Sequence, residues 1–322
     1  MIAKVSLIIP YLNNKNIEKL NFLLNAILNG KCVPKEIILV YSYKKTINIS
    51  NSLIYRLKKK KIIIKKFYKK KMYPGEARNH GIKKARNKII CFLDLETIPN
   101  KNWFLEGMKS LKLNDVSFGQ TVCSAHSYRD KIIRASTIGS KVLLTIPGSF
   151  LKKKIFLLCG LFVENVKAGE DGDFISRVNL HNIKSHSNIE KIIYNAQNNK
   201  TYKEILKKWY LNYSHAKNFP HIIVQKKIYY LPISLLLIII SFNWNRLLSQ
   251  WNEESPIYIA NITKITIFIT IIFYIILRGI IFPLKKKEKF FFILPFNFLI
   301  ISFFSFLLDI FKLLAFFNIK KK

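Results

Sequence analysis

Apolar and polar positions follow two different periods along the first 220 residues. The short apolar runs Val5 to Ile9 and Glu36 to Val40 are typical of buried strands. Residues 16–29 instead repeat their apolar positions at helical spacing and stop at Gly30, which predicts an amphipathic helix. The same alternation continues further along the chain, with a helix at 49–60, a strand at 62–67, a helix at 76–87 and a strand at 89–93. Strands that alternate with helices predict a parallel sheet covered by helices on both faces.

The last third of the chain has a different pattern. Three long apolar segments lie close together, at 228–244, 257–284 and 290–317. A helix needs about 20 apolar residues to cross a bilayer, so the second and third segments are long enough and the first is at the short limit. So many apolar runs leave too little polar surface for a soluble helical core. We therefore predict an N-terminal α/β domain over 1–220 and a membrane region over 221–322 with two or three transmembrane or interfacial helices.

The distribution of charge orients this membrane region. The loop 285–289 reads KKKEK, whereas the loop 245–256 has one arginine and two glutamates. Loops rich in lysine and arginine stay on the cytoplasmic side of a membrane. We therefore expect an integral membrane protein with a cytoplasmic N-terminal domain, in which 228–244 leads out and 257–284 returns. The segment 290–317 either spans the membrane or lies in its interface.

Composition limits the class of protein further. The chain has 54 Lys and Arg against 18 Asp and Glu, a net charge of +36, and 50% of its residues are hydrophobic, which excludes a disordered polymer. Compositional drift explains the crowding of Ile, Lys and Asn, and is compatible with attraction to anionic lipids. No recognised nucleic-acid-binding motif accompanies the charge, so nucleic acid is not an expected partner. The four cysteines have no CxxC spacing, which predicts neither a zinc site nor a disulfide framework.

Two carboxylates follow the apolar strand at 89–93. Asp94 and Glu96 are two residues apart, and in extended chain both would point to the same side and meet one divalent cation. An ordinary polar loop after a strand is the alternative. Ligands of parallel sheets bind at this carboxyl-terminal edge, where Pro10 and Tyr11 also end their strand.

A second acidic cluster stands in a stretch otherwise dominated by lysine. It contains Glu170, Asp171 and Asp173, and a helix is predicted over 173–180. Asp173 suits the N-terminal end of that helix, which favours acids. The helix end explains Glu170 and Asp171 less well. A carboxylate here that faces Asp94 could act as a general base on an acceptor hydroxyl.

One arginine stands near the start of a predicted helix. Arg78 lies in the stretch EARNHG, inside the predicted helix 76–87. Its guanidinium could pair with a phosphate or with a carboxylate of the site. A solvated cation on the helix surface is the alternative.

The order of these motifs resembles a family 2 glycosyltransferase with the GT-A fold. Four stretches carry the resemblance: VSLIIPYLNN, EIILV, PGEARNHGIKKARNKIICFLDLETIPNKNWF and PGSFLKKKIFLLCGLFVENVKAGEDGDFISRV. They resemble the first strand with its nucleotide loop, the second strand, the metal motif and the acceptor-side segment of that family. The resemblance covers roughly residues 3–215. It implies a Rossmann-like mixed sheet flanked by helices, here followed by a C-terminal helical membrane region.

The resemblance also implies roles for single residues in an inverting sugar transfer from a nucleotide-diphosphate sugar. Asp94 and Glu96 match the metal-binding positions, and Asp171 matches the catalytic base with Glu170 beside it. Further residues match the nucleotide-sugar side of the family: Pro10, Tyr11, Arg78 and Asp94. In this mechanism Asp171 takes the proton of an acceptor hydroxyl, and Mn²⁺ or Mg²⁺ stabilises the departing diphosphate.

Membrane-attached members of the family often act on lipid-linked acceptors. The resemblance therefore implies a lipid-linked glycan or polysaccharide precursor of the cell envelope as acceptor, membrane lipids as neighbours and the bacterial inner membrane as location. The basic and aromatic stretch 202–219 fits an interfacial helix, with a plain linker helix as the alternative. Trp209 stands in KKWY rather than in the QxxRW motif of processive members, so polymer synthesis is not expected. Residues 120–150 carry no readable pattern and are expected to be specificity loops.

The chain departs from the family pattern at two further places. Its second strand ends in Tyr41 and Ser42, where acidic residues usually contact the base of the nucleotide, and Glu96 is one methylene longer than the usual aspartate. These departures motivate an alternative function. The chain would then be a catalytically inactive relative that serves as a membrane scaffold or binding protein.

Overall fold

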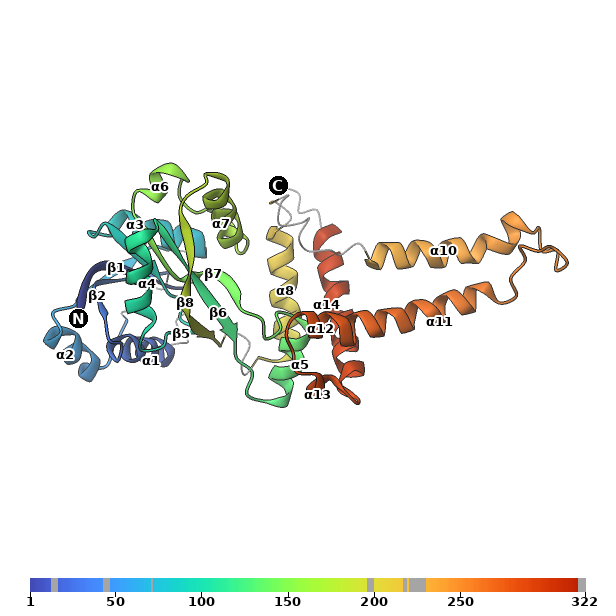
Figure 1. The fold of residues 1–322 in the computed structure, drawn as a ribbon, viewed down its shortest axis with the longest axis horizontal. Coiled ribbons are helices and arrows are strands. Elements are labelled where there is room, and N and C mark those ends of the chain that lie inside the picture. The colour runs from blue at the N-terminus through green and yellow to red at the C-terminus, as the bar shows by residue number, and fades with distance from the viewer. Residues whose placement is uncertain are drawn as a thin grey trace. The chain divides into compact units, whose positions relative to one another are not determined.

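The computed structural model describes residues 1–12, 17–42, 47–70, 72–195, 200–216, 219 and 230–317 (Figure 1). The chain forms two compact units, of which the first comprises residues 1–125 and 141–198 and the second comprises 126–140 and 199–322. This division differs from the boundary expected at residue 220. Residues 220–229, which contain that boundary and the start of the first apolar segment, lie outside the described residues.

Within the described residues, the first unit holds one eight-stranded sheet in the order β3-β2-β1-β4-β7-β6-β8-β5. Its strands are β1 (Ile2–Tyr11), β2 (Val33–Tyr41), β3 (Ile63–Tyr68), β4 (Ile89–Phe92), β5 (Thr97–Ile98), β6 (Val116–Cys123), β7 (Leu143–Lys152) and β8 (Ser185–Tyr194). The strands from β3 to β4 pair in parallel, as the sequence predicted. The sheet as a whole is mixed, because β7 runs antiparallel to β4 and β6, and β5 runs antiparallel to β8.

Helices cover both faces of this sheet, and their apolar residues form two cores. One core joins β1 to α1 (Ile17–Leu28), α2 (Asn51–Lys59) and α4 (Trp103–Leu113). The other core joins it to α3 (Pro74–Lys84), α6 (Ile155–Leu158) and α7 (Glu170–Leu180). The residues of β1 alternate between these cores, with Leu7 and Ile9 in the first and Ile8 in the second. Burial on both faces explains why this strand is apolar without interruption.

The order of the parallel strands fixes where a ligand can bind. β1 lies between β2 and β4, so the chain reverses its direction of winding beside β1. In open α/β sheets, ligands bind outside the carboxyl ends of the strands at such a switch point. Here these ends are Tyr11 of β1 and the turn that begins at Asp94 after β4.

The expectation of loops over 120–150 was wrong. The segment contains the end of β6, the helix α5 (Tyr128–Ser136) and most of β7. The pattern is hard to recognise because the β6–β7 pairing has a register shift between Ser117 and Gly119. A Cβ at Gly119 would lie 2.1 Å from the carbonyl oxygen of Pro147, so the two strands approach more closely there than any other residue allows.

The second unit is helical. Besides α5, it contains α8 (Tyr202–Ala216), α10 (Tyr230–Leu248), α11 (Ile262–Ile275), the π-helical turn η2 (Ile276–Ile281), α12 (Phe282–Lys285), α13 (Phe290–Ile293) and α14 (Asn297–Phe317). Among the described residues, two helical segments are long and apolar enough to cross a membrane. They are Ile262–Lys285 and Asn297–Ala315, with mean hydropathies of 2.5 and 2.2, and the apolar helix Pro232–Leu248 is shorter.

The segment 126–140 belongs to this unit because the basic loop 285–289 holds it. Arg134 donates from Nε to Glu288 Oε1 at 2.8 Å and from Nη2 to Oε2 at 2.9 Å. The backbone N–H of Ser140 donates to the carbonyl of Lys286 at 2.9 Å. A bidentate ion pair such as that between Arg134 and Glu288 fixes the orientation of the two side chains as well as their distance.

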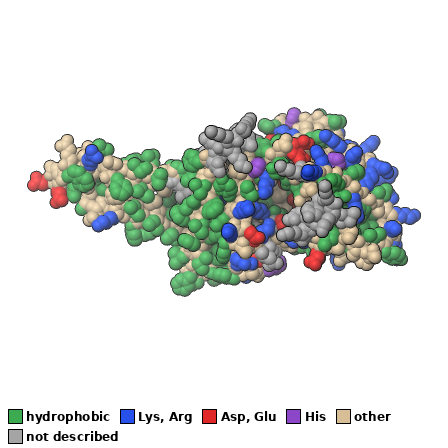
Figure 2. Space-filling view, turned by 180° about the vertical axis from the view of Figure 1, so that it is seen from behind, with side chains coloured by type: hydrophobic (Ala, Val, Ile, Leu, Met, Phe, Trp, Pro, Cys, Tyr) green, Lys and Arg blue, Asp and Glu red, His purple; other side chains and the backbone are tan. Residues whose placement is uncertain are grey.

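The apolar helices differ in how much of their surface the protein covers. α14 packs against α5 through Ile132 and Ile301, and against α8 through Ile205 and Leu308. In its most apolar stretch, 39% of the residues are buried. In the most apolar stretch of Ile262–Lys285, only 11% are buried. Figure 2 shows hydrophobic side chains gathered over the helical hairpin of α10 and α11, whose exposed residues include Leu235, Ile239, Phe268 and Ile272.

Candidate active site

Helix α3 presents Arg78 to the carboxyl-terminal edge of the sheet. Asn79 holds the helix to the segment between α6 and α7, donating from Nδ2 to the carbonyl of Phe162 at 2.8 Å and accepting from its N–H at 2.9 Å. A Cβ at Gly81 would lie 2.5 Å from Ile8 Cγ2, so the helix lies directly on β1. The Arg78 side chain is 2% exposed, and its guanidinium lies 5.5 Å from the centre of the Phe162 ring.

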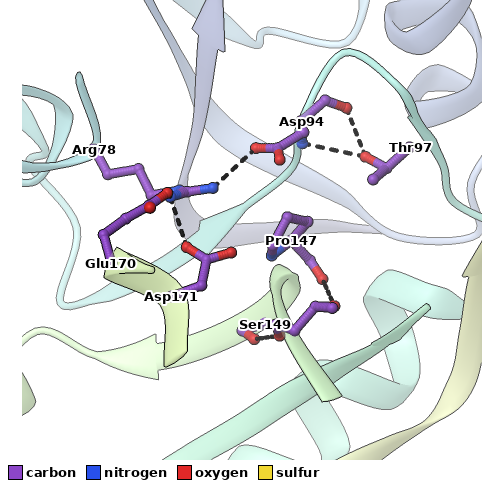
Figure 3. A network of polar contacts seen from close by, with 8 residues as sticks. Arg78, Asp94, Thr97, Pro147, Ser149, Glu170 and Asp171 are labelled. Carbon is purple, nitrogen blue, oxygen red and sulfur yellow. Dashed lines mark hydrogen bonds and ion pairs between the residues drawn. The ribbon is translucent and has the colours of Figure 1, made fainter. Parts of the chain in front are cut away.

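Three carboxylates surround the Arg78 guanidinium (Figure 3). Nη1 donates to Asp171 Oδ1 at 2.7 Å and to Glu170 Oε1 at 3.0 Å. Nη2 donates to Asp94 Oδ1 at 3.2 Å. The structure thus brings together four residues that the sequence analysis had singled out separately. A cation pairing with the site carboxylates was one of the two functional roles considered for Arg78.

The electrostatics of this cluster are unbalanced. With every group ionised, three carboxylates and one guanidinium carry a net charge of −2. Burial would lower the pKa of Arg78, but Asp171, Asp94 and Glu170 raise it above its usual range. Burial raises the pKa of Asp171 to about 8 against the opposing effect of Arg78, and Glu170 and Asp94 raise it further. Asp171 therefore binds a proton far more strongly than an ordinary aspartate.

Helix α7 divides the second acidic cluster into two parts. Its N-terminal residues Glu170 and Asp171 reach Arg78, and Gly169 before them has a φ of 104°, which favours glycine. Asp173 instead accepts from Arg177 Nε at 2.9 Å, one helical turn further on. Arg177 also donates to the carbonyl of Leu161 at 2.8 Å. Asp173 therefore has a structural ion pair, as its helix position predicted.

The chain is not extended between Asp94 and Glu96. Thr97 closes a turn, because its N–H donates to the Asp94 carbonyl at 3.0 Å and its hydroxyl donates to the same oxygen at 2.6 Å. The Asp94 carboxylate faces Arg78, whereas Glu96 Oε1 lies 3.5 Å from Lys19 Nζ of α1. The two carboxylates therefore have different cationic neighbours.

Asp94 and Glu96 supply carboxylate oxygens, the ligand type of a hard divalent cation that takes the rest of its coordination from a substrate. Among the described residues, no group of three His, Cys, Asp or Glu side chains could hold a metal ion by itself. The side chain of Asp94 is 33% exposed and that of Glu96 is 25% exposed, so carboxylate oxygens of both remain accessible. Mg²⁺ is commonly held by one or two carboxylates together with substrate phosphates and water.

Pro10 and Tyr11 end β1 beside β2. Tyr11 is opposite Tyr41 in the parallel pairing and is only 1% exposed, and burial raises its pKa. Tyr41 and Tyr68 at the ends of β2 and β3 have ring centres 5.6 Å apart. An aromatic pair therefore stands at the ends of β2 and β3, and its Tyr41 is one of the two positions, with Ser42, where the resemblance led us to expect acidic residues.

The sequence analysis did not find Tyr194. It is the last residue of β8 and pairs with Thr97 of β5, which places it beside the turn that carries Asp94 and Glu96. Burial raises its pKa, and the carboxylates of Glu96 and Asp94 raise it further. No local signal marks this tyrosine, because its strand pairs with a segment about a hundred residues earlier in the chain.

Fold and site together define an α/β domain of the GT-A type, with its polar cluster at the switch point of the sheet. Residues 6–161 match the family described as glycosyl transferase family 2. These residues, just under half of the chain, are therefore similar to that family. The fold class implied by the sequence resemblance is thereby confirmed.

Similar proteins include a curated relative and several solved structures. An uncharacterized glycosyltransferase of Rickettsia bellii (strain RML369-C) is 30% identical over 181 residues, which are 52% of this chain and 25% of the relative. The chain thus spans about a quarter of the relative's length. Mannosyltransferase PcManGT from Pyrobaculum calidifontis, in complex with GDP-Man and Mn²⁺, shares the fold with a TM-score of 0.53 at 11% identity, over 99% of this chain and 88% of that one. S. aureus TarS 1–349 in complex with UDP-GlcNAc has a TM-score of 0.44 at 14% identity, over 88% of each chain.

Proposed function

We propose that this chain is a membrane-attached glycosyltransferase. It moves a sugar from a nucleotide-diphosphate sugar to a hydroxyl or phosphate acceptor on a lipid-linked precursor. The observation that carries the proposal is the convergence of Asp94, Glu170 and Asp171 on Arg78 at the carboxyl edge of the sheet (Figure 3). The match to the family model supports the reaction class, and the nucleotide sugar bound by PcManGT agrees with the class of donor.

Asp171 is the proposed base in a single displacement on a hydroxyl acceptor. Its carboxylate takes the hydroxyl proton while the acceptor oxygen forms a bond to the anomeric carbon. The bond from that carbon to the diphosphate oxygen breaks on the opposite side, so the nucleoside diphosphate leaves and the configuration inverts. The pKa of about 8 suits this role, because a base is most effective when its pKa lies near the working pH.

Arg78 and Glu170 keep this base in place. Arg78 Nη1 donates a hydrogen bond to Asp171 Oδ1 at 2.7 Å and a second one to Glu170 Oε1 at 3.0 Å. Asp94 and Glu96 are the residues that would hold a divalent cation. The chemistry such an ion supplies when bound is neutralisation of the charge on the departing diphosphate.

The hairpin of α10 and α11 is the proposed membrane anchor, with the catalytic unit on the cytoplasmic side. Its exposed surface is apolar, and a membrane would cover it. The helix α14 lies in the interface in this proposal, because α5 and α8 already cover two of its sides. The basic loop 285–289 supports a cytoplasmic position for this end of the helices.

Donor binding and turnover of the full chain in nanodiscs test the proposal. Thermal shift with UDP-, GDP- and dTDP-sugars, each with Mn²⁺, Mg²⁺ or EDTA, identifies the donor. We expect Asp171→Asn to lower the rate of sugar transfer to a hydroxyl acceptor or water, followed as released nucleoside diphosphate, by at least about 100-fold, while the donor-induced shift remains. Asp173→Asn is the matched control, because this aspartate pairs with Arg177 outside the cluster.

Two results would count against the proposal. If no donor shifts the melting temperature of folded protein, the inactive scaffold becomes the better explanation. If Asp171→Asn turns over as fast as Asp173→Asn, then Asp171 is not the base, whatever the chain binds.

A further inference from the structure

A second cluster of charged side chains lies inside the apolar helices of the second unit. Arg278 on η2 places Nε 2.8 Å from Asp309 Oδ2, and Lys312 donates from Nζ to Asp309 Oδ1 at 2.9 Å. Tyr274 donates from its hydroxyl to Asp309 Oδ2 at 3.0 Å. Asp309 is 1% exposed and Arg278 is 4% exposed, so water screens these charges little.

Among the described residues, two cations of this cluster share one carboxylate, which leaves a formal charge of +1 when all three are ionised. Excess charge among apolar helices is unfavourable, and an anion bound beside the cations would offset it. The accessible side of the cluster is its positive end, since the side chain of Lys312 is 12% exposed and that of Asp309 is 2% exposed.

Two hydrogen-bond donors beside the cluster have no acceptor among the described residues. Among the described residues, the indole Nε1 of Trp209 and the hydroxyl of Ser305 are buried without a hydrogen-bond partner. The Trp209 ring centre lies 5.3 Å from Lys312 Nζ. Ser305 precedes Asp309 by four residues on α14, and hence lies on the same face of the helix. Buried polar atoms are nearly always satisfied, so orphan donors around a net positive charge indicate a missing anionic acceptor.

We propose that this cluster binds the phosphate group of an anionic membrane lipid. Lys312 and Arg278 would supply the charge, and the Trp209 N–H and the Ser305 hydroxyl would donate to phosphate oxygens. The amphipathic helix α8, which carries Trp209, sets the site at the depth of lipid headgroups. This inference rests on the proposed membrane attachment and not on sugar transfer.

Lipid retention by the full chain in nanodiscs tests this inference. The bilayers contain phosphatidylcholine alone, or phosphatidylcholine with phosphatidylglycerol or with phosphatidic acid, and native mass spectrometry counts the lipids that stay bound. We expect anionic lipid to be retained, and Lys312→Gln to weaken its binding about tenfold, as expected for loss of a charged hydrogen bond. Trp209→Phe keeps the ring and removes the donor, so a loss of about threefold is expected.

Matched controls separate the site from the general charge of the chain. Lys264→Gln and Trp251→Phe change exposed residues of the same unit and should leave retention unchanged. Lys312→Arg should restore binding, which guards against misfolding of the glutamine variant. Competition by inorganic phosphate would identify a free phosphate as a source, and its failure to compete would identify the lipid headgroup; both outcomes support a phosphate site. Equal retention of neutral and anionic lipids, or equal losses in the control variants, would overturn the proposal. Since no sugar donor is present, failure here leaves the transferase proposal untouched.

Discussion

Replacing Arg78 by methionine tests whether one guanidinium keeps three carboxylates together. Methionine retains most of the side-chain stem and removes the charge and the donors. The 2.7, 3.0 and 3.2 Å contacts to Asp171, Glu170 and Asp94 are then lost, and three acids face one another in a site that is mostly shielded from water. We expect Arg78→Met to destabilise the first unit strongly at pH 8.

The size of the effect follows from burial. Removing one partner of a buried ion pair costs about 3–5 kcal/mol. Asp94 and Asp171 are each 33% exposed, so solvent screens part of the repulsion and the lower value of about 3 kcal/mol applies. This corresponds to roughly a hundredfold larger opening constant. The cost should shrink at pH 5.5. Burial already raises the pKa of Asp171 to about 8, and loss of Arg78 removes the charge that lowers it. A group whose folded-state pKa lies above its unfolded value loses stability as pH rises through that interval.

The four cysteines allow the opening of the first unit to be measured within the full chain. Cys32, Cys91, Cys123 and Cys159 are all buried and all belong to the first unit, so pulse labelling of thiols in urea reports its opening alone. Arg86→Met is the control, because its side chain is exposed and a change below about 0.5 kcal/mol is expected. If Arg78→Met is no less stable than Arg86→Met, the three contacts do not hold the site together and the electrostatic reasoning fails.

Three further predictions concern the base, the core and the second unit. The pH profile of kcat/KM reports groups of the donor-free enzyme, and it should rise with pH and level off above about 8, because Asp171 must lose its proton to act. A flat profile between about pH 6 and 10 would rule this out. Gly107→Ala should cost about 1–3 kcal/mol by thiol labelling, because its Cβ would lie 2.2 Å from the fully buried ring of Phe150. Glu288→Gln should speed tryptic cleavage after Arg134, whose two-pronged contact it weakens; an unchanged rate would mean that this pair does not hold 126–140.

The central strands were predictable because their burial on both faces leaves a local signal in the sequence. β1 and β4 lie inside the sheet with helices on both faces, and their uninterrupted apolar runs follow from that position. The edge position of Asp94 followed in the same way, from a strand that ends abruptly. The helical spacing of 16–29 likewise gave α1 to within one residue at each end.

The pairing of distant residues was not predictable in this way. Arg78 meets Glu170 and Asp171 across more than 90 positions of sequence, and nothing near either motif indicates the partner. The association of 126–140 with the second unit depends on Glu288, a further 154 positions beyond Arg134. Local periodicity reports which face of an element is buried, whereas such contacts depend on the whole topology.

Charge links the composition of the chain to the chemistry of its site. The net charge of +36 should draw anionic nucleotide sugars toward the protein from a distance. The cluster around Arg78 carries −2 when fully ionised, so a diphosphate placed beside it would be repelled at short range. Two responses reduce that repulsion: Asp171 retains a proton, as its pKa of about 8 allows, or a divalent cation binds Asp94 and Glu96 together with the diphosphate. Only the second leaves Asp171 ionised and able to accept a proton. Electrostatics therefore supports, independently of family resemblance, the proposal that a divalent cation accompanies the donor at this site.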